Sequence, residues 1–219
     1  MLGLPESTVV NRTIPKSKFY DKTSINSKVK DLFVKEISNI TWKNKISKDT
    51  INLEPTEAVK EIEVFEINLK ENRFSKDILK HIDKFIPYNI LYVLRFDHKA
   101  KLSIAYKEAN KNDDSKMVID SYYESEWVDE SDFEFQFDLS HDLKYVYDEL
   151  IKSFIKTTEV DTTTDIKEVI KQEKEMESLN KEIEKLQKQV KKEKQFNRKV
   201  ELNKILNEKK YKLEKALNA

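Results

Sequence analysis

The chain has 219 residues, with 41 basic and 41 acidic side chains, one glycine (Gly3) and no cysteine. These counts exclude a Walker A loop, a dinucleotide-binding fingerprint and a nucleophile elbow, because each needs glycines where the backbone meets a ligand or turns sharply. The lack of cysteine excludes a thiolate nucleophile, a disulfide framework and a cysteine zinc site.

The N-terminal region predicts an arm, a helix and two short strands. Residues 1–20 contain two prolines, and we expect them to form an extended or loosely helical arm. Apolar residues at helical spacing predict a helix that is capped at Asn26-Ser27 and runs to about residue 39. Short strands are expected over residues 40–46 and 50–53, around Trp42.

A strand–helix–strand unit follows. Residues 61–70 (EIEVFEINLK) predict a strand because of their length and β-branched content. Ser75 is suited to cap a helix that ends before Pro87, with its buried stripe at Ile78, Leu79, Ile82 and Phe85. The apolar run at residues 88–96 (YNILYVLRF) predicts a strand that is buried on both faces and parallel to the first.

The rest of the first domain predicts antiparallel strands and one more helix. A polar turn at residues 97–100 should lead into a hairpin strand at 101–107. Alternating runs predict strands at 117–127 and 133–139, and a helix is expected over 142–155. Together these elements predict one α/β (α+β) domain over residues 1–155, a mixed sheet with a βαβ unit and antiparallel hairpins, covered by helices.

The C-terminal quarter has a different composition. A Thr-rich linker is expected at residues 156–164, before a long charged, coiled-coil-like helix over 165–219 that contains no Gly or Pro. Its apolar residues are spaced 3-4-3-4, and the spacing changes near Gln195–Arg198, where the helix can drift, bend or fold back. We expect this seam, together with the aromatic residue at the change, to bind a partner: Met176, Leu179, Ile183, Leu186, Val190 and Phe196.

The zero net charge conceals an uneven distribution. Residues 108–142 contain 12 acidic and 2 basic side chains, whereas Lys188–Lys199 (KQVKKEKQFNRK) contains six basic and one acidic. Such runs are usually solvated surfaces, but a basic run can also contact phosphate or an acidic protein surface. The candidate phosphate-binding residues are Lys191, Lys192, Arg198 and Lys199.

One enzymatic alternative rests on the strand at residues 61–70. A metal-dependent nuclease of the restriction-enzyme kind needs carboxylates and a lysine to hold Mg²⁺ and activate water. Glu63, Glu66 and Lys70 are the candidates, although Glu-Ile-Asn-Leu-Lys is two residues longer than the usual Glu-x-Lys. The other interpretation is that these are strand-edge charges in contact with solvent. No pair among the three histidines has metal-ligand spacing, so no other metal or cofactor is expected.

Eight segments, spread over nearly the whole chain, carry a resemblance. In order they are LGLPESTVVNRTIPKSKFY, WKNKIS, EVFEINLK, IDKFIPYNILYVL, IAYK, YYESEW, DLKYVYDELI and KEKQFNRKVELN. From Leu2 to about Leu213 the chain resembles the uncharacterised prokaryotic domain-of-unknown-function family 4391. The resemblance assigns no catalytic residue. It implies a setting beside helicases and DNA methyltransferases, in restriction-modification-like or antiviral islands.

These observations lead to one functional expectation and two alternatives. We expect an accessory or scaffolding subunit of a bacterial DNA-modifying or antiviral defence system, without enzymatic activity. Its partner would be a helicase, a methyltransferase or a second copy, and nucleic acid would meet the basic tail. The alternatives are a divergent Mg²⁺-dependent nuclease and a coiled-coil adaptor with no nucleic-acid connection. No secretory signal or membrane-length apolar run is present, so a cytoplasmic protein is expected.

Overall fold

The computed structural model describes residues 2–21, 26–110, 113–155 and 164–217. The chain divides into two compact units: the body, Met1–Phe154, and the C-terminal unit, Ile155–Ala219. Residues 156–163 of the expected linker lie outside the described residues. The body has the mixed α/β architecture that the sequence predicts.

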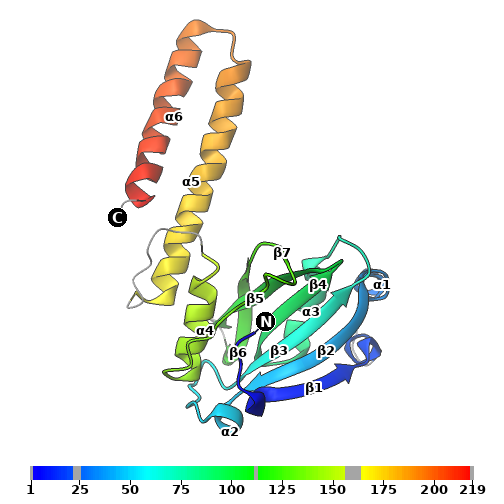
Figure 1. Cartoon of the computed structure of the whole chain (residues 1–219). Helices are drawn as coiled ribbons and strands as arrows, with labels where there is room; N and C mark the ends of the chain where they lie inside the picture. The colour runs from blue at the N-terminus through cyan, green and yellow to red at the C-terminus, as the bar shows by residue number, and fades with distance from the viewer. Residues whose placement is uncertain (1, 22–25, 111–112, 156–163, 218–219) are drawn as a thin grey trace. The chain divides into compact units, whose positions relative to one another are not determined.

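In the described part of the body, seven strands form one mixed sheet in the order β1-β2-β3-β4-β5-β6, with β7 paired to β5 (Figure 1). Only β3 and β4 are parallel, and the helix α3 (Lys76–Phe85) connects them, which confirms the βαβ prediction. The strands are β1 (Val9–Ile14), β2 (Ile37–Ile46), β3 (Ile62–Leu69), β4 (Asn89–Phe96), β5 (Lys99–Asn110), β6 (Asp113–Glu124) and β7 (Val128–Asp129).

The main apolar core lies between the sheet and the helices α1 (Ser27–Glu36) and α3. Alternation along β3 directs Phe65, Ile67 and Leu69 into this core, where they meet Ile78, Leu79 and Ile82 of α3. Phe85, expected in the same buried stripe, is instead 47% exposed. It is the last residue of α3, so less of the sheet and its neighbours covers its ring.

Three local predictions differ from the structure. Residues 50–53 are not a strand: the Ser47 amide donates to Thr50 Oγ1 (3.0 Å), and the chain turns through α2 (Lys48–Ile51). Residues 133–139 form one isolated bridge, between Phe135 and Leu2, and the Phe135 ring packs against those of Phe137 and Phe154. The expected arm contains β1, flanked by the short 3₁₀ helices η1 (Glu6–Thr8) and η2 (Lys16–Phe19).

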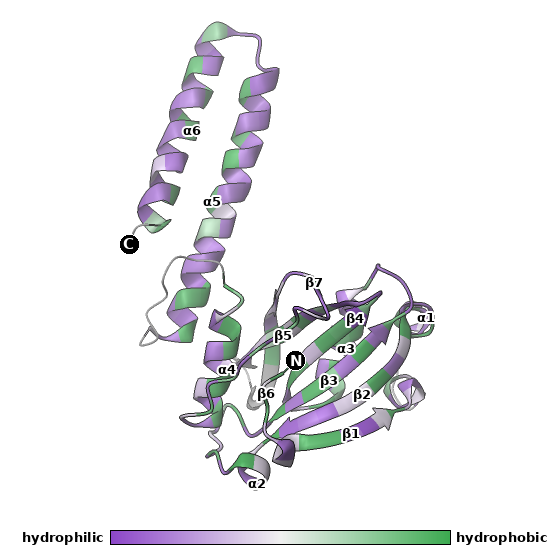
Figure 2. Ribbon diagram, in the orientation of Figure 1, coloured by the Kyte–Doolittle hydropathy of each residue, from purple (hydrophilic) through white to green (hydrophobic). Residues whose placement is uncertain are grey.

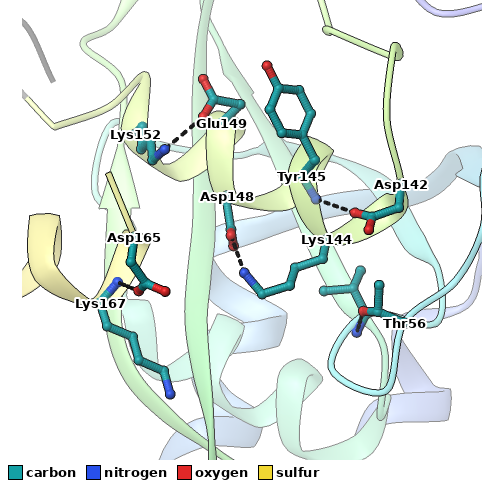
Figure 3. Close-up of polar contacts among 10 residues, drawn as sticks. Thr56, Asp142, Lys144, Tyr145, Asp148, Glu149, Lys152, Asp165 and Lys167 are labelled. Carbon is teal, nitrogen blue, oxygen red and sulfur yellow. Dashed lines mark hydrogen bonds and ion pairs between the residues drawn. The ribbon is translucent and has the colours of Figure 1, made fainter. Parts of the chain in front are cut away.

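The last helix of the body is α4 (Leu143–Lys152), and Figure 3 shows its polar contacts. The Asp142 side chain caps it by accepting a hydrogen bond from the Tyr145 amide (2.8 Å). Tyr147 fixes α4 to β5, since its hydroxyl donates to Ala105 O (2.7 Å) and accepts from the Lys107 amide (3.0 Å). These bonds satisfy backbone groups beside the irregularity in the β5–β6 ladder.

Glu36 joins α1 to α3. Its side chain is buried, and its Oε2 accepts a hydrogen bond from the Ser75 amide (2.7 Å) at the start of α3. We expect Glu36→Ala to lower the free energy of unfolding by about 1–3 kcal/mol, because the buried amide loses its acceptor. Urea unfolding followed by tryptophan fluorescence measures this, and Asp31→Ala, on the exposed side of α1, is the control. Equal stability of the two variants would contradict the assigned role.

The C-terminal unit is a helical hairpin. The helices α5 (Ile166–Lys192) and α6 (Phe196–Leu217) are separated by residues 193–195, and both are mostly hydrophilic (Figure 2). Asp165 caps α5 by accepting from the Lys167 amide (2.7 Å). The apolar spacing changes at the point where the chain reverses direction. Of the three possibilities that this change left open, drift, bend or fold back, the helix folds back.

Candidate functional site

The structure does not bring the nuclease candidates together. Glu63 and Glu66 lie on opposite faces of β3, because they are three positions apart and side chains along a strand alternate between its two faces. The ammonium group of Lys70 is held at the end of the strand, where it donates to Val34 O (2.8 Å). The three side chains therefore share no site that could hold Mg²⁺ and a water.

Glu66 belongs to a separate ionic chain. Its Oε2 accepts from Arg95 Nε (2.7 Å), and Arg95 Nη1 pairs with Glu130 Oε1 (2.7 Å). The guanidinium also lies over the Phe133 ring, with 5.6 Å between Cζ and the ring centroid. Burial lowers the pKa of Arg95, but the hydrogen bonds and charges of Glu130 and Glu66 outweigh this effect, so the pKa is raised. Among the described residues, no three His, Asp or Glu side chains are grouped to hold a metal ion.

A buried ion pair lies at the base of a cleft of about 910 Å³ between α3 and β6. Lys107 Nζ is 3.0 Å from Asp83 Oδ1, and the two side chains are only 4% and 0% exposed. The Tyr122 hydroxyl donates to Asp83 Oδ2 (2.6 Å), and Lys107 donates to Tyr88 O (2.6 Å). Burial raises the pKa of Asp83, and Lys107 opposes that shift.

Two of the three other lysines that line this cleft are paired, and the third, Lys84, has no ion-pair partner among the described residues. Lys76 pairs with Glu124 (3.1 Å) and Lys80 with Asp77 (3.3 Å). We interpret the buried pair at this cleft as a structural junction of α3, β5 and β6. Sequence reasoning missed the ion pair, since its members come from elements far apart in the chain.

The apolar seam of α5 meets α6 of the same chain. Met176 and Ile183 on α5 and Leu206 on α6 are buried, and Lys209 Nζ is 2.6 Å from Glu182 Oε2 across the two helices. The other seam residues, Leu179, Leu186 and Val190, lie on the same face of α5 and are half-buried. In this arrangement α6 covers part of the seam, and three of its five apolar residues keep some exposed surface.

The tip of the hairpin, residues 188–199, is mostly exposed. Its basic side chains are exposed, and Arg198 Nε lies 3.5 Å from Glu193 Oε2 at the reversal. Phe196, the first residue of α6, is 78% exposed, the largest value among the exposed large apolar residues of the described chain. All four candidate phosphate-binding residues and the aromatic candidate therefore occur together on this tip: Lys191, Lys192, Arg198, Lys199 and Phe196.

A comparison with protein families now identifies the chain. A family model described as a domain of unknown function, DUF4391, matches residues 2–213. The chain belongs to this family. The match covers both units of the DUF4391 chain, so the hairpin is part of what defines the family and not an appendage. No curated protein and no solved structure matches it. In the described ranges, no helix has both the length and the apolarity required to span a membrane.

Proposed function

We propose that this DUF4391 protein is an accessory subunit of a bacterial DNA-modifying or antiviral defence system, and that the tip of its hairpin contacts nucleic acid. The body would be the docking module for a helicase or methyltransferase. One observation carries the proposal: an exposed phenylalanine stands among six basic side chains at the reversal of the hairpin.

The chemistry of the tip suits a phosphate backbone. Lysine and arginine side chains bind phosphates and release counterions, and an exposed aromatic ring adds stacking with unpaired bases. The nuclease alternative has no comparable support, because Glu63, Glu66 and Lys70 are separated and Glu66 is paired with Arg95. The adaptor alternative accounts for the covered seam but gives no role to the exposed Phe196.

A gel-shift titration tests the proposal. We expect the variant with Lys191, Lys192, Arg198 and Lys199 all changed to Glu to bind DNA at least about 100-fold more weakly at moderate salt. The slope of log affinity against log salt should also fall by about 0.9 for each duplex phosphate that the variant no longer neutralises. Phe196→Ala should weaken binding to single strands more than to duplexes.

The matched control makes the same charge change elsewhere on the hairpin. Lys167, Lys171, Lys210 and Lys212 are exposed and lie outside the tip, and changing all four to Glu should leave most of the affinity. Equal losses in the two quadruple variants would show a general charge effect and contradict the proposal. Absence of any shift by the unmodified protein at low salt would also contradict it, and would direct attention to an acidic protein surface.

A further inference from the structure

A pocket of about 290 Å³ opens on the body where the start of β3 lies beside β1, β2 and the end of α3. Aromatic side chains supply much of its lining: Trp42 is half-buried, and Phe85 and Tyr88 are 47% and 38% exposed. A largely apolar hollow with a few fixed polar groups is typical of small-ligand sites. Sequence reasoning placed Phe85 in the core, whereas the structure places it in the wall of this pocket.

Glu63 lies in the lining of this pocket, and one of its carboxylate oxygens lacks a donor. The residue is only 4% exposed, and Oε2 accepts no hydrogen bond from any described group. A buried acceptor without a donor is costly, so Glu63 calls for a partner that the described residues do not supply. Burial, reinforced by the Glu61 charge, raises the pKa of Glu63 to about 7, while Trp42 and Lys45 act in the opposite direction.

Two cations complete the pocket. Arg12 and Lys18 line it, both are exposed, and neither has an ion-pair partner among the described residues. A simple organic cation would be attracted by Glu63 but repelled by this pair. The complementary ligand therefore has a flat apolar ring, donors on one edge and an anionic group at the other end.

Among the nucleobases, guanine matches this set best. Its N1–H and N2–H groups are adjacent donors, so an ionised carboxylate can accept from both at once. Adenine and cytosine present one donor beside a ring-nitrogen acceptor, which would face the second carboxylate oxygen. Uracil has one N–H between two carbonyls. Aromatic side chains stack on any base, so the discrimination depends on Glu63.

We propose that this pocket binds a guanine nucleotide, with the donor edge of the base on Glu63, the ring against Trp42 and Tyr88, and the phosphate on Arg12 and Lys18. A free mononucleotide and the terminal guanine of a single strand offer the same chemistry. The site is on the body and does not depend on the nucleic-acid contact proposed for the hairpin tip.

Calorimetric titration of the full-length protein with GMP, AMP, CMP and UMP tests this site. At about pH 8, where Glu63 is mostly ionised, we expect GMP to bind at least about ten-fold more tightly than the other three. Guanosine, which lacks the phosphate, should bind more weakly than GMP. An oligonucleotide ending in guanine that binds more tightly than GMP would identify a strand end as the source; the reverse order would identify the free nucleotide.

Glu63→Gln is the decisive variant because it keeps the shape and replaces one acceptor by a donor. We expect it to weaken GMP binding at least about ten-fold and to abolish the preference for guanine, while the melting temperature shows that the fold is kept. Glu66→Gln, on the opposite face of the same strand, should leave GMP binding unchanged.

A pH series gives an independent readout. The charged groups around Glu63 are Glu61 beside the start of β3, Lys45 on β2, Arg12 on β1 and Lys18 on η2, and the Tyr88 phenol also lines the pocket. Protonation of Glu63 replaces an acceptor by a donor, so GMP affinity should fall as the pH drops through about 7. Three results would overturn the proposal. They are a lack of saturable GMP binding at up to about 1 mM, equal affinity for the four nucleotides, and unchanged GMP binding by the Glu63→Gln variant.

Discussion

Lys107→Met is expected to lower the free energy of unfolding of the body by about 3–5 kcal/mol. The substitution preserves most of the side-chain volume but leaves the Asp83 carboxylate, which is 0% exposed, without its cation. Tyr122 would remain as the hydrogen-bond donor to Asp83, and Tyr88 O would lose its donor. Urea unfolding followed by tryptophan fluorescence measures the loss in the body alone, since Trp42 and Trp127 both belong to it.

The loss should depend on pH in a defined direction. Burial raises the pKa of Asp83, and removal of Lys107 removes the charge that opposes this rise. A carboxyl whose folded-state pKa lies above its unfolded-state value favours folding most at low pH, and this contribution disappears as the pH rises through the folded-state pKa. The stability difference between Lys107→Met and the unmodified protein should therefore be smaller in acid and grow towards neutral pH.

A double variant separates loss of the charge pair from loss of packing. Asp83→Asn combined with Lys107→Met removes both charges and keeps a hydrogen-bond acceptor for Tyr122, so it should recover a large part of the lost stability. A loss below about 1 kcal/mol in Lys107→Met, or a loss that does not change with pH, would show that the ion pair is not closed in solution.

The parts of the fold that the sequence predicted are those whose signals are local. The stretch of residues 61–96 carries its own cap at Ser75, its own apolar stripe and two apolar strands, and all three elements form as expected. The hairpin between β4 and β5 is also local, because Asp97 and His98 both adopt left-handed backbone conformations (φ 45° and 62°) that a tight turn requires.

The parts that the sequence missed depend on distant partners. The strand β1 forms by pairing with β2, which follows it after a whole helix, and the register between them is irregular. The Asp83–Lys107–Tyr122 cluster combines residues of three elements, and no spacing in the sequence marks it. By contrast, the alternation of side chains along a strand is enough to place Glu63 and Glu66 on opposite faces of β3. The sequence alone therefore indicates that these two carboxylates do not share a metal site.

Leu206→Asp is expected to open the helical hairpin. Leu206 is the buried residue of α6, and it lies on the face that meets Met176 and Ile183 of α5. An aspartate there would bury an unpaired charge between the two helices, which is costly. The helices also depend on packing of their apolar faces for most of their stability, and the substitution removes part of that packing. The chain has no cysteine, so spin labels on cysteines introduced at positions 182 and 209, whose native side chains meet at 2.6 Å, report this contact cleanly.

In the unmodified background the two labels should show strong dipolar broadening, and Leu206→Asp should remove it. Ile205→Asp is the matched control, because it adds the same charge one residue away at a position that is 44% exposed, and the broadening should persist. Persistent broadening in Leu206→Asp would mean that the seam does not hold α5 and α6 together. Loss of broadening in Leu206→Asp but not in Ile205→Asp would show that burial of Leu206 in the apolar seam holds α5 against α6.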